Sequence, residues 1–210
     1  MDVSKLVEKP INRKEIITLS KPEEKIDEIL LFVKKQIENG NQVFWVCPLI
    51  EESKKLDYSA AIKKFNSLSK KFFDKVGLIH GSLEKNKKDE VLLKFLNKKI
   101  DILVSTTVIE VGIDFPNANV IVIENSNKFG LSQLHQLRGR VGRGINQGTC
   151  ILLYKKNLSE NAKKRIKILK SSNDGFLIAE EDMRLRGFGD VLGYQQSGIK
   201  NFKLADPVHH

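Results

Sequence analysis

Several residue types and motifs are scarce in this sequence, and each absence excludes a class of protein. The chain has two cysteines, Cys47 and Cys150, and each lies inside an apolar run, where thiols are usually buried and unpaired. A disulfide-stabilised fold and a metal site are therefore not expected. The sequence contains neither a signal peptide nor an apolar run of about 18 residues, so we expect no membrane contact and a cytoplasmic location.

A Gly-Lys dipeptide is also absent, and without it the chain has no Walker A loop to cradle the phosphates of a nucleotide. The only Asp-Glu pairs, Asp27-Glu28 and Asp89-Glu90, lie on predicted amphipathic helices and lack the pattern that follows a catalytic Asp-Glu pair. We therefore expect the chain alone to hydrolyse no nucleoside triphosphate.

Positive charge is abundant, but it is unevenly divided between lysine and arginine. The net charge of +10 favours a polyanionic partner, with nucleic acid as the first candidate. Of the 36 basic residues only seven are arginines, and five of these seven lie within 138–143 and 184–186. This placement indicates a need for the planar, bidentate guanidinium group, which suits phosphate oxygens. For the first stretch, a solvated basic loop is the alternative interpretation.

Short apolar runs and amphipathic segments alternate along the chain. Runs typical of strands buried on both faces lie at Val43–Cys47, Val76–Ile79, Ile100–Val104, Val120–Ile123 and Thr149–Tyr154. Helical spacing follows Ser20 and Ser159, and it also marks Tyr58–Phe73, Glu84–Asn97 and Leu131–Val141. The alternation predicts an α/β fold with a doubly wound parallel sheet. Ligands of such sheets bind at the carboxyl ends of the strands, where loops should begin at Pro48, His80, Ser105 and Glu124.

The pattern divides the chain into three segments. Residues 1–19 have no clean periodicity and are interpreted as a linker or entry segment. Residues 20–170 carry the α/β pattern, which begins with a capping box at Ser20–Glu23 and a helix that ends at Gly40. Residues 171–210 are expected to form a small helical appendage, in which Asp174 caps a helix running to Arg186.

Two stretches carry residues typical of a ligand site. Gly130–Gly144 places Arg138, Arg140 and Arg143 among glycines, whose missing side chains let the backbone approach a ligand closely. The stretch 105–116 follows a predicted strand, and its hydroxyls and amides suit a phosphate of a nucleic-acid strand, with Asp114 as an acceptor for a sugar hydroxyl. Taken alone, this second stretch is equally consistent with an ordinary loop whose Thr106 caps a helix.

Taken together, the segments 106–114 and 136–143 resemble motifs V and VI of the superfamily-two helicases. The resemblance implies the second of two RecA-like motor domains, with ATP and Mg²⁺ held mainly by the first. It assigns Gln136, Arg140 and Arg143 to the nucleotide as catalytic groups, and one of the two arginines is expected to act as an arginine finger. It also assigns Gly112 and Asp114 to nucleotide binding. The residues that it assigns to the nucleic acid are Thr106, Thr107, His80 and Gly81, although a purely structural role for His80 is equally consistent with the sequence.

Longer segments, spread over residues 12–206, are similar to the RecG family of bacterial branch-migrating DNA helicases. They are Val46–Ser53, Phe129–Leu137, Ser172–Phe176 and Leu185–Gly193 followed by Gln195–Gly198. The last is similar to the translocation motif that RecG shares with the transcription-repair coupling factor, a helical hairpin and loop. The resemblance implies that Arg184, Arg186 and Gln196 relay motor closure to duplex DNA. Phe188 stands where the family has proline, which leaves only the conformation of that turn open.

The function implied by this resemblance is that of a monomeric bacterial ATP-dependent DNA helicase, which regresses stalled replication forks and migrates branched junctions in DNA repair and recombination. Its partners would be branched or duplex DNA and the N-terminal motor and wedge domains of the same parent chain. The alternatives are the motor domain of a transcription-repair coupling factor and a non-catalytic nucleic-acid-binding module. The retained Gln136, Arg140 and Arg143 favour a motor over a non-catalytic module.

Overall fold

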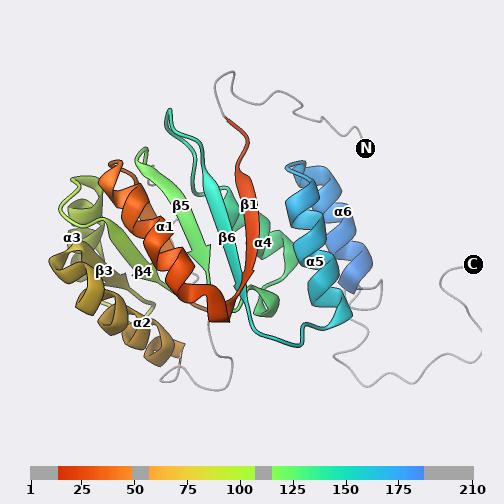
Figure 1. Cartoon of the computed structure of the whole chain (residues 1–210), viewed down its shortest axis with the longest axis horizontal. Helices are drawn as coiled ribbons and strands as arrows, with labels where there is room; N and C mark the ends of the chain where they lie inside the picture. The colour runs from red at the N-terminus through yellow and green to blue at the C-terminus, as the bar shows by residue number, and fades with distance from the viewer. Residues whose placement is uncertain (1–13, 49–56, 107–114, 187–210) are drawn as a thin grey trace, which may run out of the picture.

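Six parallel strands form one open sheet (Figure 1). The computed structural model describes residues 14–48, 57–106 and 115–186. The strands are β1 (Ile17–Pro22), β2 (Gln42–Val46), β3 (Val76–Ile79), β4 (Ile102–Ser105), β5 (Ala118–Ile123) and β6 (Thr149–Tyr154). Their order is β1-β6-β5-β2-β4-β3, and every neighbouring pair is parallel, so all carboxyl ends meet at one edge of the sheet. The predicted α/β class with a parallel sheet is confirmed.

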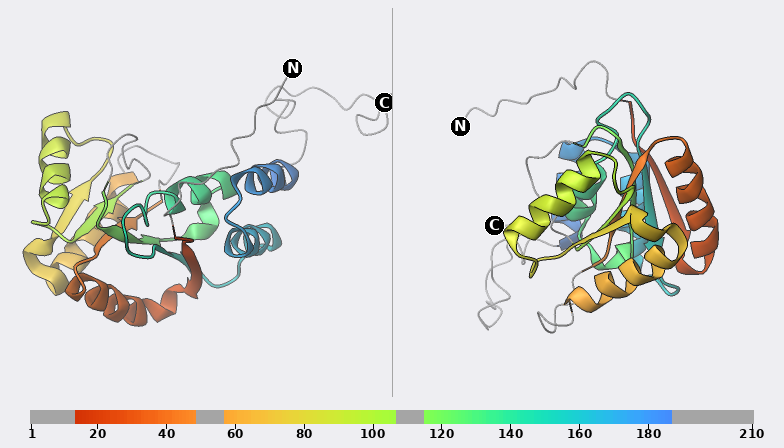
Figure 2. Two further views of the ribbon diagram at one scale, coloured as in Figure 1. Left: turned by 90° about the horizontal axis from the view of Figure 1, so that it is seen from above. Right: turned by 90° about the vertical axis from the view of Figure 1, so that its left-hand side faces the viewer.

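Helices cover both faces of this sheet (Figure 2). The helices are α1 (Ile26–Glu38), α2 (Asp57–Phe72), α3 (Lys85–Leu96), α4 (Leu131–Arg138), α5 (Glu160–Ser171) and α6 (Gly175–Arg186). Apolar residues of α1 and α2 pack with Val43 and Trp45 of β2, whereas those of α3 to α6 pack with Phe44 and Val46 of the same strand. Because successive side chains of a strand point to opposite faces, both sets are buried, which explains the unbroken apolar runs.

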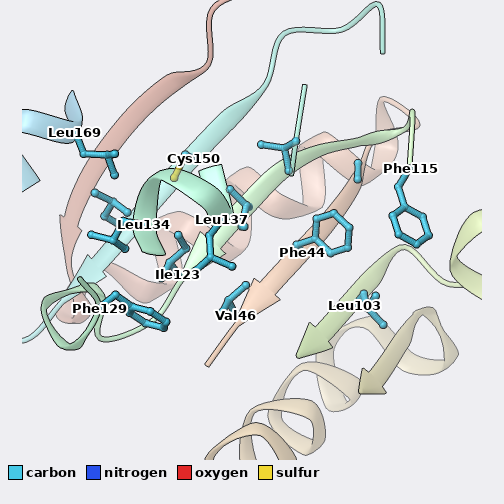
Figure 3. Close-up of a cluster of buried hydrophobic side chains, with 14 of the residues drawn as sticks. Phe44, Val46, Leu103, Phe115, Ile123, Phe129, Leu134, Leu137, Cys150 and Leu169 are labelled. Carbon is cyan, nitrogen blue, oxygen red and sulfur yellow. The ribbon is translucent and has the colours of Figure 1, made fainter. Parts of the chain in front are cut away.

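An aromatic cluster anchors the start of β5 to the core on the α3 side of the sheet. Phe115 packs edge-on against Phe44 with ring centroids 5.7 Å apart (Figure 3). It also packs edge-on against Phe95 at 5.3 Å, and all three rings are buried. Burying one such ring stabilises the fold by about 1.5–3 kcal/mol. The cluster therefore fixes the backbone that directly follows Asp114, one of the predicted nucleotide-binding residues.

The amino-terminal part of the fold differs from the sequence prediction. Ser20 and Pro22 belong to β1, which pairs with β6 along Ile17–Pro22, so the predicted capping box does not form. A 3₁₀ turn at Glu23–Lys25 follows, and α1 begins only at Ile26. Backbone pairing with a strand far along the chain outweighs the local capping signal here, and proline is tolerated because β1 is an edge strand. The predicted boundary after residue 19 thus falls inside a strand.

Two helices near the carboxyl end have boundaries set by caps. Helix α4 ends at Arg138 and not at the predicted Val141, because the chain turns at Gly139 and reaches a left-handed conformation at Gly142, with φ of 68°. The Asp174 side chain accepts a hydrogen bond from the Phe176 N–H at 2.9 Å, so the predicted cap of α6 is confirmed. Helix α6 lies beside α5 and buries Ile178 in the main core, which joins the start of the expected appendage to the α/β body.

Candidate functional site

The arginine-bearing loop, residues 139–148, connects α4 to β6 at the amino ends of the strands. The Gly142 N–H donates to the Ala118 carbonyl at 3.3 Å at the start of β5, and the Ile17 N–H of β1 donates to the Gly148 carbonyl at 2.9 Å. We expected ligands to bind at the carboxyl ends of the strands. This loop lies at the opposite edge of the sheet. The general rule for open α/β sheets does not place this part of the site.

The glycines of this loop serve contacts within the protein. A Cβ atom added at Gly144 would collide with the Pro116 carbonyl oxygen, and one added at Gly142 would lie 3.0 Å from the Gly148 Cα. At these two positions the backbone approaches another part of its own chain closely. These contacts within the chain account for Gly142 and Gly144 without a ligand, and the close approach of a ligand to them stays a prediction.

Arg138 is a structural residue. Its side chain is buried, and one guanidinium nitrogen donates to the carbonyls of Leu169 at 2.6 Å and Ser172 at 2.9 Å. The other nitrogen donates to Nδ1 of His135 at 3.0 Å. Burial lowers the pKa of the Arg138 guanidinium, which the hydrogen bonds hold in place. The planar guanidinium group of Arg138 therefore binds backbone carbonyls at the end of α5, whereas the sequence analysis assigned such groups to phosphate oxygens.

Arg140 and Arg143 face outward by comparison. Arg140 is half-buried, and its guanidinium forms no hydrogen bond or ion pair with the part of the chain that the structure describes. Arg143 is exposed, with Nε donating to the Gly139 carbonyl at 3.4 Å, and Gln136 is exposed on α4. One half-buried and one exposed arginine on the same loop suit the oxygens of an anion such as phosphate.

Three further predicted residues, Thr106, His80 and Gly81, lie at the carboxyl ends of β3 and β4. The Thr106 N–H donates to the Ile79 carbonyl at 3.3 Å, which brings Thr106 beside His80 at the end of β3. Thr106 is fully buried, and its Oγ1 has no hydrogen-bond partner among the described residues. A buried hydroxyl without a partner is costly, so it marks a position where a further polar group is expected.

His80 lies against the ring of Tyr58, with centroids 4.7 Å apart. Burial, with the nearby charge of Lys88, lowers the pKa of the His80 imidazole, so the ring is neutral at neutral pH. The Lys88 ammonium donates to the Gly81 carbonyl at 3.3 Å, and a Cβ at Gly81 would meet the Tyr58 hydroxyl at 3.3 Å. His80 and Gly81 therefore lie beside Thr106 in contact with Tyr58 and Lys88, which is consistent with either the structural or the nucleic-acid interpretation.

The predicted site residues thus fall at two opposite edges of the sheet. Thr106, His80 and Gly81 lie at the carboxyl edge, and Arg140 and Arg143 at the amino edge. Of the segment resembling motif V, the structure describes Thr106, at the carboxyl edge, and the chain is described again from Phe115, which precedes β5. The structure does not describe Thr107, Gly112, Asp114 and Gln196, and it does not describe the side chain of Arg186.

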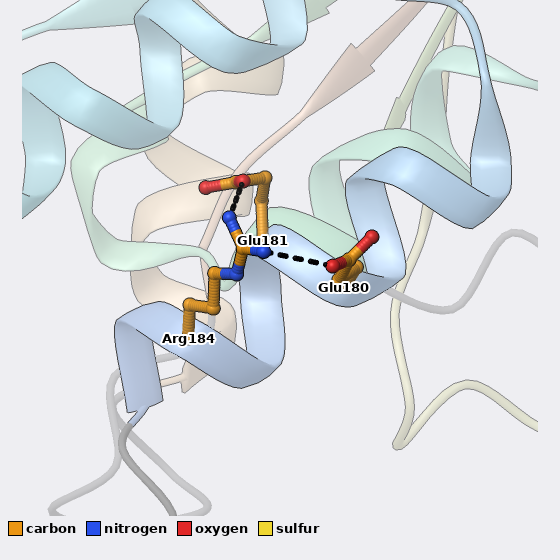
Figure 4. A network of polar contacts seen from close by, with 3 residues as sticks. All are labelled: Glu180, Glu181 and Arg184. Carbon is orange, nitrogen blue, oxygen red and sulfur yellow. Dashed lines mark hydrogen bonds and ion pairs between the residues drawn. The ribbon is translucent and has the colours of Figure 1, made fainter.

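Arg184, assigned by resemblance to the DNA relay, forms ion pairs within α6. Its two terminal nitrogens lie 2.9 Å from a Glu180 oxygen and 3.0 Å from a Glu181 oxygen (Figure 4). The arginine side chain is 63% exposed, so these pairs contribute little to stability and can be exchanged for another anion.

Two polar contacts at the carboxyl edge escaped the sequence analysis. Asp182 of α6 accepts hydrogen bonds from the Leu131 N–H at 3.2 Å and the Ser132 hydroxyl at 2.5 Å, which ties α6 to the start of α4. Glu124 forms an ion pair with Lys64 at 2.6 Å. Each pair joins residues distant in sequence, so no local pattern announces it.

The fold and the arginine loop define a motor domain of the helicase type. The chain belongs to the family described as helicase conserved C-terminal domain, which matches residues 21–144. A second family, described as ATP-dependent DNA helicase RecG, domain 3, C-terminal, matches residues 172–208.

The chain is similar over nearly its whole length to proteins named ATP-dependent DNA helicase RecG. It is 50% identical to that of Bacillus subtilis (strain 168) over 100% of this chain and 31% of the relative. It is 44% identical to that of Escherichia coli (strain K12) over 98% of this chain and 30% of the relative. A solved structure described as "Structure of RecG bound to three-way DNA junction" has a TM-score of 0.75 and 45% identity, covering 93% of this chain and 25% of that one.

The chain spans about a third of the length of these curated relatives. Within residues 14–48, 57–106 and 115–186, no helix is both long and apolar enough to cross a membrane. The same ranges contain no group of three or more histidine, cysteine or acidic residues suited to a metal ion.

Proposed function

We propose that this chain is the second motor domain of an ATP-dependent helicase that translocates on double-stranded DNA, regresses stalled forks and migrates branched junctions. The observation that carries the proposal is the arginine loop: Arg143 is exposed and Arg140 half-buried at the amino edge, on a loop that is hydrogen-bonded to the sheet. The similarity to RecG helicases over nearly the whole chain supports it.

In this proposal the residues of each edge have separate roles. Arg140 and Arg143 contact the phosphates of ATP, with Mg²⁺, held mainly by an N-terminal motor domain of the same parent chain, and they stabilise negative charge that develops during hydrolysis. Gln136, Gly112 and Asp114 belong to the same nucleotide-facing group. We assign Thr107, His80 and Gly81 to contacts with the DNA backbone, together with Thr106, whose side chain is fully buried in this structure.

The carboxyl-terminal segment completes the proposed division, with residues 20–170 as motor and 171–210 as translocation segment. Arg184, Arg186 and Gln196 relay domain closure to the duplex. The Arg184 ion pairs are exposed and thus open to competition from a phosphate. A wedge domain of the same parent chain recognises the fork, and the assembled protein acts as a monomer in the bacterial cytoplasm.

Two other functions are less well supported. A transcription-repair coupling factor would share the arginine loop, but the family matching 172–208 is described as RecG and the relatives named above bear the same name. A non-catalytic binding module has no need of accessible arginines at the edge opposite to its nucleic-acid site.

The test is Arg143→Ala in the assembled enzyme. We expect DNA-stimulated ATP hydrolysis to fall on the order of 1,000-fold, as for other arginine fingers, with DNA affinity within about twofold of wild type. Ile145→Ala, an exposed residue of the same loop, is the control and should change neither measurement. Wild-type hydrolysis by Arg143→Ala would refute the proposal.

A further inference from the structure

Three amide side chains meet at the amino edge of the sheet, beneath the arginine loop. Asn41 lies between α1 and β2, Asn119 is in β5, and Asn146 lies in the loop three residues after Arg143. Oδ1 of Asn41 accepts one hydrogen bond from Nδ2 of Asn119 and another from Nδ2 of Asn146, each at 2.9 Å. Asn41 is 8% exposed and Asn119 is 2% exposed, whereas Asn146 is exposed, so the acceptor side of this junction is shielded from water and the Asn146 side is not.

The remaining contacts hold Asn41 in one orientation. Its Nδ2 donates to Oε1 of Gln36 at 2.8 Å, and its backbone N–H donates to the Gln36 carbonyl at 3.0 Å. All polar groups of the Asn41 amide are thus paired, which fixes Oδ1 toward the loop.

The same junction reaches the segment that follows Asp114. Asn119 Nδ2 also contacts the Asn117 carbonyl at 3.3 Å, and that carbonyl accepts the Gln42 N–H at 2.7 Å. Asn41 therefore lies between the segment that begins at Phe115 and the arginine loop. Elsewhere the loop is held by the glycine contacts with Pro116 and Ala118, which fix its backbone upstream of Asn146.

We propose that Asn41 and Asn146 are positioning residues that hold Arg143 at the nucleotide-facing edge, although neither touches the nucleotide. The inference rests on the proposed function for its effect on hydrolysis, but its structural part can be tested in the chain alone. A small displacement of a group that acts in the transition state lowers the rate of the chemical step. We therefore expect the Asn146–Asn41 hydrogen bond to affect turnover more than ATP affinity.

The first test replaces one donor at two neighbouring positions. Asn146→Asp keeps the shape of the side chain but cannot donate to Asn41, whereas Gln147→Glu removes an exposed donor that reaches only the Glu15 carbonyl, at 3.3 Å. Both variants add one negative charge to the loop. Asn146→Ala removes the donor without adding charge and guards against a misfolded Asn146→Asp protein.

Amide hydrogen exchange of the chain alone measures how firmly the Asn146–Asn41 hydrogen bond holds the arginine loop. We expect both Asn146 variants to speed exchange of the Gly142 amide by about five- to tenfold, as loss of one hydrogen bond predicts, and Gln147→Glu to change it by less than about twofold. Equal exchange in the Asn146 and Gln147 variants would overturn the inference without any bearing on the helicase proposal.

Hydrolysis by the assembled enzyme separates positioning from general stability. We expect Asn146→Asp to lower kcat about tenfold with KM for ATP changed by less than about threefold. In the Arg143→Ala background, Asn146→Asp should lower kcat no further, because its effect passes through that arginine. Additive losses would refute the positioning role, whereas an Arg143→Ala enzyme with normal turnover would refute the proposed function instead.

Discussion

Replacing Arg138 by lysine tests whether this arginine, at the end of α4, serves the stability of the fold and not the binding of a ligand. The change keeps the positive charge but removes the fork that bonds the carbonyls of Leu169 and Ser172 and Nδ1 of His135. A lysine ammonium reaches one side of this site, so we count one carbonyl and the His135 nitrogen as losing their donor. At about 1–3 kcal/mol for each buried acceptor left unpaired, the loss is about 2–6 kcal/mol.

The assay is thermal and denaturant unfolding of the chain alone. A loss of about 3 kcal/mol corresponds to a Tm lower by about 6–12 °C in a domain of this size. Arg143→Lys is the matched control, because Arg143 is exposed and its replacement should alter stability by less than about 0.5 kcal/mol. If both variants unfold at the same temperature, the assignment of Arg138 to structure is wrong.

Two further predictions concern a close backbone approach and the buried thiols. Gly144→Ala should lower the free energy of unfolding by more than about 1 kcal/mol, because its Cβ collides with the Pro116 carbonyl, whereas Gly139→Ala should cost less; similar melting of the two would contradict the contact. Burial raises the pKa of the Cys47 thiol and raises that of Cys150 to about 12, so neither should react with Ellman's reagent at about pH 8 until the protein unfolds. Rapid reaction of the native chain would show that a thiol is accessible.

The strands buried on both faces were predictable because their signal is local. Val76–Ile79 and Thr149–Tyr154 have the predicted bounds, since an apolar run of that length has few other stable placements. Strand β1 was missed because its residues alternate in burial at the edge of the sheet and because Ser20 and Glu23 carry the signature of a helix cap. Only the partner strand β6, more than a hundred residues later, decides between the two outcomes.

The candidate site shows the same division. The arginines and glycines of 138–144 were found from their spacing, and of the arginines Arg138 is buried, Arg140 half-buried and Arg143 exposed. The amide junction of Asn41, Asn119 and Asn146 has no such spacing, because its members come from a helix end, a strand and a loop. Single asparagines in a sequence are typical of turns and caps, so nothing local distinguishes these three.

By itself, the sequence determined the α/β class, most of the strands and the concentration of arginine in one motif, since these depend on residue type and short spacing. The tertiary structure decided which arginine serves the fold and which face outward. Arg138 is buried because the carbonyls that it binds belong to residues 31 and 34 positions later, brought to it by α5. Three-dimensional packing also placed the arginine loop and Thr106 at opposite edges of the sheet, because the strands are all parallel and the loop precedes β6 whereas Thr106 follows β4.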